Sequence, residues 1–384
     1  MTKETFKGIT WDHPRGYEPL IAASDAYYKI TGVKVDWQVR SLKDFGDQSL
    51  LSLARKFDLL IYDHPHCGAA ARSKCVLALE EYLDPAILSQ LELQSAGPSF
   101  ESYNYAGHQW ALPIDAAFQS ASYRPDLMDM PVPVNWEGVF GLVKELKRKN
   151  KYVGMALCPT DSLCTFLSLT AQFGSPIRED GELVDPNTGI KVLELMQRMR
   201  DEFHPASLDW NPIQLYDHMA EEDEIVYAPL AFNYVNYSHN GFRKNILTYT
   251  NAPGTTSVLG GAGIAVSATC KNKPGAVDFA AWVCGEYIQK GIYTRVQGQP
   301  GNIKAWEDPL ANTLTHDFFI NTRHGLNHAY IRPRFLTWPM FQEYLGNAIH
   351  MSLKEGPDIP STLHHLNSTY KEIKQRLGNK GIIA

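Results

Sequence analysis

The triplet Asp-His-Pro occurs twice early in the chain, at residues 12–14 and 63–65, each time after an apolar run that predicts a β-strand. A carboxylate is a strong acceptor for hydroxyl donors, and an imidazole can either donate or accept. Ligand sites in open α/β sheets form at the carboxyl ends of the strands, so both loops are predicted to bind a ligand. For Asp12 the alternative is a helix cap, and for the second loop it is ordinary loop contacts with backbone or solvent. The side chains concerned are Asp12, His13, Asp63, His64 and His66.

The second loop also allows an enzyme interpretation. His64 and His66 have the His-x-His spacing by which metal-dependent amidohydrolases present two imidazoles to a divalent ion. The third ligand would be Asp63, His13 or His108. Such an enzyme would be a (β/α)₈ barrel, and the long helical pattern over residues 135–203 interrupts the alternation that a barrel requires. A metal-dependent hydrolase is therefore the alternative, and the chain is expected not to be an enzyme.

Strand and helix patterns alternate in the first third of the chain, which is typical of βαβ units on a mostly parallel sheet. The later part is mainly helical between residues 135 and 203 and returns to extended and Gly-rich segments before its last helices. The predicted strands or extended segments are 6–11, 33–40, 58–62, 108–123, 224–238 and 257–267. The predicted helices are 19–30, 50–54, one from about 135, 190–199, 274–288, 339–353 and 361–377.

Composition excludes several classes of function. The 384 residues include 36 Lys and Arg against 42 Asp and Glu, which gives a net charge of −6. The chain therefore has no excess of positive charge that would favour binding to nucleic acid. The length predicts two lobes, and an apolar share of 44% is ample for packed cores. Six scattered cysteines form no C-x-x-C pair and are expected to be mostly buried thiols.

Seven segments, in a fixed order along nearly the whole chain, carry a family resemblance. They are ITWDHPRGYEPL, LIYDHPHCGAAARSKCVLALEEYL, YNYAGHQWALPIDAAFQSASYRPDLM, NWEGVFGLVKELK, GGAGIAVSATCKNKPGAVDFAAWV, GQPGNIKAWED and RPRFLTWPMFQEYLGNAIHMSLKEG. They resemble extracellular solute-binding protein family 1, the receptors of carbohydrate-type ABC importers, whose best-known member is the maltose-binding protein. One departure is Tyr123-Arg124, where the family has Tyr-Asn.

The resemblance implies an α/β, periplasmic-binding-protein-like fold of type II, with hinge-linked lobes and a ligand cleft between them. The expected N-terminal lobe is 1–113 plus 262–306, and the C-terminal lobe is 114–261 plus 307–384. The implied function is a solute receptor that closes on a sugar, a sugar acid or a polyhydroxy acid. Hinge crossings are expected near 113–115 and 260–263, with a third around 306–310.

The resemblance also implies a wider set of ligand residues. Arg15 would suit an acidic group on the ligand, because a guanidinium pairs well with a carboxylate. Tyr234 and Trp338 would stack on a sugar ring, with burial in a core as the alternative, and Gly261 would allow close backbone approach, with a β-bulge as the alternative. Arg332 and Arg334 are expected at the surface. The further ligand residues implied by the resemblance are Arg15, Tyr17, Asp115, Gln119, Asn233, Tyr234, Gly261 and Trp338.

The expected partners are a small-molecule solute and the membrane permease of an ABC importer, with no nucleic acid. We expect a monomer that needs no cofactor and holds no metal in its ligand site. The resemblance implies a periplasmic or other extracytoplasmic location. The alternative is the cytoplasm, because the sequence starts without a signal peptide and its cysteines look free.

Overall fold

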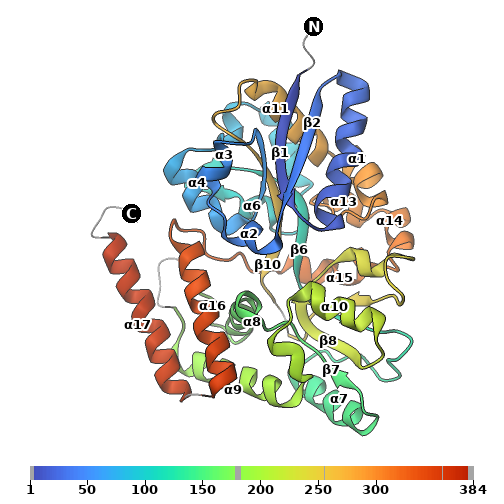
Figure 1. The fold of residues 1–384 in the computed structure, drawn as a ribbon, viewed down its shortest axis with the longest axis vertical. Helices are drawn as coiled ribbons and strands as arrows, with labels where there is room; N and C mark the ends of the chain where they lie inside the picture. The colour runs from blue at the N-terminus through green and yellow to red at the C-terminus, as the bar shows by residue number, and fades with distance from the viewer. Residues whose placement is uncertain (1–3, 178–182, 255, 357, 379–384) are drawn as a thin grey trace. The chain divides into compact units, whose positions relative to one another are not determined.

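The computed structural model describes residues 4–177, 183–254, 256–356 and 358–378, which fall into two compact units (Figure 1). Unit 1 comprises the residues up to Ala117 together with Gly260–Asn327 and Arg334–Pro339. Unit 2 comprises Phe118–Leu259, His328–Pro333 and the residues from Met340 onward. The chain therefore passes between the units more than once, and both units are discontinuous in sequence.

Unit 1 is built on a sheet with the strand order β2-β1-β3-β10-β6. Strand β1 is parallel to both β2 and β3, whereas β10 is antiparallel to β3. The strands are β1 (Thr5–Trp11), β2 (Lys34–Arg40), β3 (Leu59–Tyr62), β6 (Leu112–Tyr123) and β10 (Leu259–Val266), with a separate pair β4 (Asn104–Tyr105) and β5 (His108–Gln109). The helices are α1 (Pro14–Thr31), α2 (Leu42–Asp47), α3 (Leu50–Ala54), α4 (Cys67–Ser73), α5 (Pro85–Leu93), α6 (Ser99–Ser102), α11 (Lys273–Cys284), α12 (Glu286–Ile288), α13 (Ile303–Trp306), α14 (Pro309–Leu314) and α15 (Phe318–Asn327), with short turns η1 (His64–His66), η2 (Leu79–Glu81) and η5 (Gln289–Tyr293).

Each face of this sheet is covered by its own apolar core. Successive residues of a strand point to opposite faces, so Leu59 and Ile61 of β3 pack on one side while Leu60 and Tyr62 pack on the other. Helices α1 and α11 supply the first core, and α3 and α4 supply the second. The continuous apolar run of β3 is thus that of a strand buried on both faces.

Helix α1 begins five residues earlier than predicted, at Pro14 instead of Pro19. The side chain of His13 caps it by accepting a hydrogen bond from the Arg15 N–H at 3.1 Å, and Pro14 occupies the first helical position, where a missing N–H costs nothing. Pro19 lies inside the helix. The helix ends at Gly32, which adopts the left-handed conformation.

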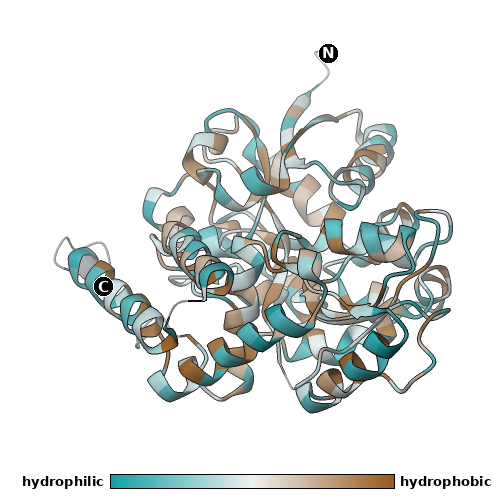
Figure 2. Ribbon diagram, turned by 60° about the horizontal axis from the view of Figure 1, so that its bottom comes forward, coloured by the Kyte–Doolittle hydropathy of each residue, from teal (hydrophilic) through white to brown (hydrophobic). Residues whose placement is uncertain are grey.

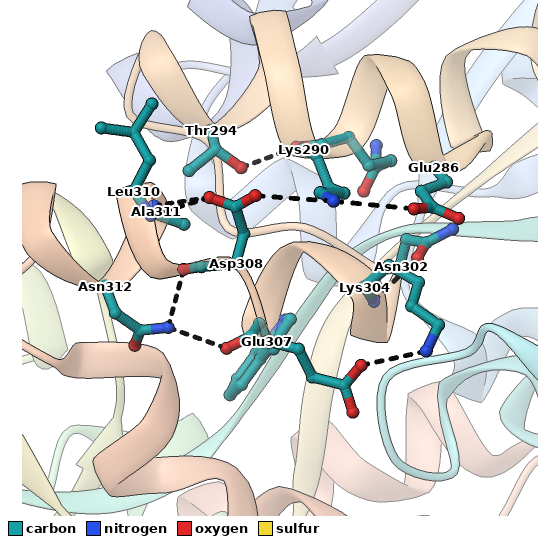
Figure 3. A network of polar contacts seen from close by, with 12 residues as sticks. Glu286, Lys290, Thr294, Asn302, Lys304, Glu307, Asp308, Leu310, Ala311 and Asn312 are labelled. Atoms are coloured by element: carbon teal, nitrogen blue, oxygen red, sulfur yellow. Dashed lines mark hydrogen bonds and ion pairs between the residues drawn. The ribbon is translucent and has the colours of Figure 1, made fainter.

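Residues 307–327, predicted for the second lobe, belong to unit 1 instead. Trp306 packs against Phe318 and Phe319, with ring centroids 6.2 and 5.1 Å away. Figure 3 shows the accompanying polar network, in which Lys290 lies between the carboxylates of Glu286 and Asp308 at 3.7 and 3.5 Å. These contacts join α15 to α13 and the start of α14 to η5, so the chain stays within unit 1 through 306–310, where a crossing was expected.

Unit 2 combines the end of β6 with three further strands and most of the remaining helices. Strand β8 pairs with β6 in antiparallel fashion and with β7 in parallel fashion, while β9 pairs with β6. The strands are β7 (Tyr152–Val153), β8 (Ile225–Phe232) and β9 (Thr248–Thr250), and the helices are α7 (Trp136–Arg148), α8 (Pro159–Gln172), α9 (Pro186–Glu202), α10 (Pro212–Glu221), α16 (Trp338–Glu355) and α17 (Ile359–Gly378), with turns η3 (Pro205–Leu208) and η4 (Val235–Ser238). The predicted extended segment 224–238 therefore ends at Phe232, and a 3₁₀ turn follows it.

The last two helices are amphipathic, and Figure 2 shows both hydrophilic and hydrophobic residues along α17, the helix beside the C-terminus. On α16 the apolar side chains recur every four residues, and Phe341, Leu345, Ile349 and Leu353 are all buried. On α17, Leu363 packs close to Gly189 of α9, where an added Cβ would lie 2.6 Å from a leucine methyl group. Helix α17 therefore completes the core of unit 2.

Arg124, the departure from the family's Tyr-Asn pair, is almost fully buried in unit 2. Its guanidinium binds the carboxylates of Asp126 and Asp223 at 2.7 and 2.9 Å and donates to the carbonyls of Met219 and Glu222. The substitution thus creates a structural contact that ties the end of β6 to the segment after α10.

All six cysteines are free, and five of them are buried, as their scattered positions predicted. Within the described part of the chain, no helix has both the length and the apolar composition needed to cross a bilayer.

We predict that Gly261→Ala destabilises the protein more than Gly107→Ala. Both glycines have positive φ angles, of 102° and 81°. A Cβ at Gly261 would lie 2.4 Å from the Asp115 carbonyl oxygen, whereas a Cβ at Gly107 meets nothing within 4 Å. Backbone strain alone costs about 1–2 kcal/mol, so the variant at Gly261 should lose clearly more in urea unfolding. Equal losses would contradict the steric explanation.

Candidate functional site

The two Asp-His-Pro loops lie at the same edge of the unit 1 sheet. In the pairing of β1 with β3, Ile9 stands opposite Leu60, and Asp12 and Asp63 each follow three residues later. Because the two strands are parallel, their carboxyl ends meet at one edge. We call residues 12–17 and 63–68 the strand-end loops, although they include the first turn of α1 and, in the second case, η1 and the start of α4. This is the edge at which α/β folds of this kind place their ligands.

Within the first strand-end loop, the roles of Asp12 and His13 are divided. Asp12 is exposed, and its backbone N–H donates to the Arg40 carbonyl at 2.7 Å, which fixes the backbone beside the end of β2. His13 is buried and serves as the cap of α1. The helix cap considered for Asp12 is therefore made by its neighbour, and the Asp12 carboxylate is oriented toward solvent. Tyr17 is half-buried in the first turns of α1.

Arg15 and Asp115 form a buried, bidentate ion pair. The Arg15 Nε lies 2.8 Å from one carboxylate oxygen, and a terminal nitrogen lies 2.5 Å from the other. The two side chains are 4% and 0% exposed. Burial raises the pKa of the Asp115 carboxyl, and the guanidinium of Arg15 opposes that shift. The positive charge predicted to meet an acidic ligand is thus compensated within unit 1.

The second strand-end loop places His64 and His66 in different surroundings. The Nδ1 of His64 lies 3.1 Å from an Asp63 carboxylate oxygen, and His64 is fully buried. The Nε2 of His66 lies 2.8 Å from the Gly46 carbonyl oxygen. Among the described residues, neither histidine belongs to a group of three His, Cys, Asp or Glu side chains whose ligand atoms lie within 4.8 Å of one another. The two histidines of the alternative hydrolase interpretation thus make separate contacts, His64 with Asp63 and His66 with the Gly46 carbonyl oxygen.

Two other residues of unit 1 that were predicted to contact the ligand, Gly261 and Trp338, are packed against other parts of this unit. A Cβ at Gly261 would lie 2.4 Å from the Asp115 carbonyl oxygen, so glycine is needed for the packing of its own strand, and its close approach to a ligand stays a prediction. Trp338 is fully buried, and its ring packs edge to face on Phe335 with centroids 5.6 Å apart. A stacking role for Trp338 stays a prediction that would require its indole face to become exposed.

In unit 2, the predicted residues Gln119, Asn233 and Tyr234 are all buried. The Gln119 side chain accepts a hydrogen bond from Ser168 at 2.6 Å, and the Asn233 N–H donates to the Phe118 carbonyl at 3.1 Å. Tyr234 packs near Tyr216, with ring centroids 6.5 Å apart. Gln119 and Asn233 thus connect β6 to its neighbours, and their contact with a ligand stays a prediction.

Two buried charged residues of unit 2 were not predicted as site residues. Asp161, in the first turn of α8, is 4% exposed, and Arg332, expected at the surface, is 3% exposed. Burial raises the pKa of Asp161 to about 6, while the hydrogen bond from the Cys158 thiol at 3.0 Å and the charge of Arg332 act in the opposite direction. Arg332 also donates to Gln342 at 3.3 Å and lies over the ring of Phe232. In the sequence, Pro159 and Asp161 look like the proline and the acidic residue of an ordinary first helical turn. Their spacing therefore gave no sign that Asp161 would be buried.

Arg334 was also expected at the surface and is only half-buried. Its guanidinium donates to the carbonyls of Glu101, Ser102 and Asn104 at 2.8, 3.2 and 2.8 Å. These bonds tie the segment before α16, which is part of unit 1, to α6 and β4.

The family model of bacterial extracellular solute-binding proteins matches residues 22–311, which is about three quarters of the chain. The chain belongs to this family. Among curated protein sequences, none matches this solute-binding protein.

Several solved structures share the fold of this solute-binding protein over nearly its whole length. An ABC transporter solute-binding protein from Agrobacterium radiobacter K84, in complex with ribitol, has a TM-score of 0.81 at 19% identity, covering 96% of this chain and 98% of its own. Maltose-bound MalE3 from T. maritima has a TM-score of 0.82 at 14% identity, covering 96% and 99%. The GacH receptor of Streptomyces glaucescens has a TM-score of 0.79 at 14% identity, covering 97% and 98%. The fold is therefore the two-lobed fold of periplasmic solute-binding proteins.

Replacing Arg15 by Leu should lower the free energy of unfolding by about 3–5 kcal/mol, because it leaves the Asp115 carboxylate buried without its counter-charge. The control is Lys43→Met, which removes an exposed pair with Asp47 and should cost less than about 1 kcal/mol. Urea unfolding of both variants measures the difference. If the two variants lose the same stability, the pair does not hold unit 1 together.

The raised pKa of Asp161 predicts a pH dependence of stability. Between about pH 4 and about pH 6 the native state keeps the Asp161 proton, whereas the unfolded chain releases it near the ordinary value of 3.8. The free energy of unfolding should therefore fall as the pH rises through this window and level off above it. Urea unfolding across this range should show the fall in the wild type, and its absence in Asp161→Asn. Parallel curves for the two proteins would contradict the shift.

Proposed function

We propose that this protein is the solute receptor of a carbohydrate-type ABC importer and that it binds a small, uncharged polyhydroxy compound, a sugar or a sugar alcohol. The family assignment carries the receptor function. Solved proteins of the same fold are in complex with ribitol, α-D-tagatose, maltose and acarbose, and these ligands support the carbohydrate class. The receptor would bind its solute and pass it to a permease without chemical change.

The buried pair of Arg15 and Asp115 supports an uncharged ligand over an acidic one. An acidic ligand needs an available cation, and Arg15 already pairs with a carboxylate through two hydrogen bonds. The exposed carboxylate of Asp12 suits hydroxyl donors and would repel an anion. We therefore favour neutral sugars over the sugar acids and polyhydroxy acids that the sequence also allowed.

The proposed mechanism is closure of two lobes on the ligand. The strand-end loops would supply contacts from unit 1, with Asp12 and Asp63 as hydroxyl acceptors, and Asn233 and Tyr234 would supply contacts from unit 2. A ligand shifts such an equilibrium only by binding the closed form more tightly than the open form. We also propose that the protein is monomeric. We propose further that it works outside the cytoplasm, as the name of its family states for the group.

A calorimetric screen against ribitol, tagatose, maltose and acarbose, with galacturonate as the acidic comparison, tests the ligand class. We expect saturable binding of at least one neutral compound, with a smaller radius of gyration in solution scattering when the receptor is saturated. Binding of the acid alone would contradict the proposed ligand class. Binding without compaction would contradict the closing mechanism.

Asp12→Ala should weaken binding of the ligand found in that screen by about tenfold or more, because charge-assisted hydrogen bonds contribute roughly 1.5–3 kcal/mol. The matched control is Asp25→Ala, which removes an exposed carboxylate from the middle of α1. Both variants should keep the wild-type melting temperature, since both side chains are exposed. Unchanged affinity in the Asp12 variant would show that the first strand-end loop is not a ligand loop.

A further inference from the structure

Unit 2 holds a group of two histidines and one glutamate that the proposed receptor function does not use. His204 follows α9, His218 lies on α10, and Glu224 immediately precedes β8. The Nε2 atoms of His204 and His218 lie 3.3 and 3.2 Å from the same oxygen of Glu224. All three ligand atoms lie within 4.8 Å of one another. We call these residues the histidine–glutamate cluster.

The geometry points to a binding site for a divalent transition metal ion such as Zn²⁺ at the histidine–glutamate cluster. Zinc binds imidazole nitrogen and carboxylate oxygen at about 2.0–2.2 Å, so neighbouring ligands of a tetrahedral site lie about 3.3 Å apart. The two nitrogen–oxygen distances have this length. Two imidazoles and one carboxylate also form a ligand set that Zn²⁺ accepts, and water would supply the fourth ligand.

The aromatic surroundings hold both imidazoles in place. The ring of Trp210 is stacked on His204, with centroids 4.9 Å apart and planes 5° apart, and it packs against His218 at 4.9 Å. Tyr152 meets the edge of His204 at 5.2 Å. Trp210 is fixed in turn, because its carbonyl accepts from the Cys158 N–H and the next residue, Asn211, caps α10. The ligand atoms therefore need little rearrangement to meet a metal ion.

A histidine of the cluster can bind a metal ion through Nε2 only when its ring proton is on Nδ1. In the described part of the chain, the Nδ1 of His218 makes no hydrogen bond, so this ring can carry its proton there and offer Nε2 to a metal. The Nδ1 of His204 accepts from the Ala206 N–H at 3.3 Å, and that long hydrogen bond must open when Nε2 binds a metal. We therefore expect a reversible site that exchanges its ion, not one that retains it through purification.

The histidine–glutamate cluster is separate from the proposed ligand residues of unit 2. Glu224 stands before the first residue of β8, and Asn233 follows its last residue. Nine residues of extended chain span about 30 Å. The cluster and Asn233 thus lie at opposite ends of one strand. The side chains of the cluster are 13%, 27% and 44% exposed, so an ion can reach them from solvent.

Titration of tag-free, chelator-treated protein with Zn²⁺ near pH 7.5, by calorimetry, tests the site. We expect one Zn²⁺ per chain and a higher melting temperature, because the ion binds the native state. His218→Asn and Glu224→Gln should each weaken binding by about tenfold or more. The matched control, His108→Asn, removes a histidine that contacts Glu80 in unit 1, and it should bind Zn²⁺ as the wild type does.

Circular dichroism of each variant without metal identifies any loss of fold. If only one of the two cluster variants, His218→Asn or Glu224→Gln, remains folded, its Zn²⁺ affinity alone tests the proposal. Absence of Zn²⁺ binding to the wild type at millimolar concentration would overturn the proposal, and the cluster would then be a hydrogen-bonded group only. Stoichiometric binding that survives the change of both His204 and His218 to Asn would also overturn it. Neither result would affect the sugar-binding proposal, which the ligand screen tests without metal.

Discussion

The buried ion pair between Arg15 and Asp115 determines how unit 1 presents its polar edge. It joins the first turn of α1 to the middle of β6, two segments that are 100 residues apart in sequence. A buried charge is tolerated only when it is paired and hydrogen-bonded, so neither group can turn toward another partner without a large cost. The start of α1, and with it the position of Asp12, therefore depends on this contact.

Unit 2 uses buried charge in a different way. Asp161 is buried, and although the Cys158 thiol and the charge of Arg332 favour its ionised form, burial outweighs them and raises its pKa. Arg124 is also buried but has two carboxylates within 2.9 Å. Charged residues in this unit thus differ in how completely their charge is compensated. The less compensated groups are the ones whose protonation can respond to their surroundings.

Much of the fold could be predicted from the sequence, because strand and helix periodicity is a local property. The bounds of α3 were predicted correctly, and the strands β1, β2 and β3 were found in their places. The start of α1 was missed because the polar residues after β1 were predicted to form a loop, whereas His13 and Pro14 begin the helix. The assignment of residues 307–327 failed because the packing of Trp306 on Phe318 cannot be deduced from spacing.

The candidate site was less predictable, because its chemistry depends on contacts between distant residues. The types of residue in the strand-end loops indicated polar groups at a sheet edge, and strand pairing brings those loops together. The sequence could not reveal that Asp115 neutralises Arg15, or that Arg332 is buried. The histidine–glutamate cluster carries no motif, since its members come from three separate elements with irregular spacing.

The discontinuity of unit 1 has a consequence for the order of folding. Strand β10 lies between β3 and β6 in the sheet, yet the 135 residues 124–258, all in unit 2, separate it from β6 along the chain. During synthesis from the N-terminus, unit 1 must wait with an incomplete sheet until β10 has emerged, whereas most of unit 2 is already available. Contacts of such long sequence separation slow folding and leave strand edges unpaired for longer. The nascent N-terminal segment is therefore the part of this protein most dependent on protection from aggregation.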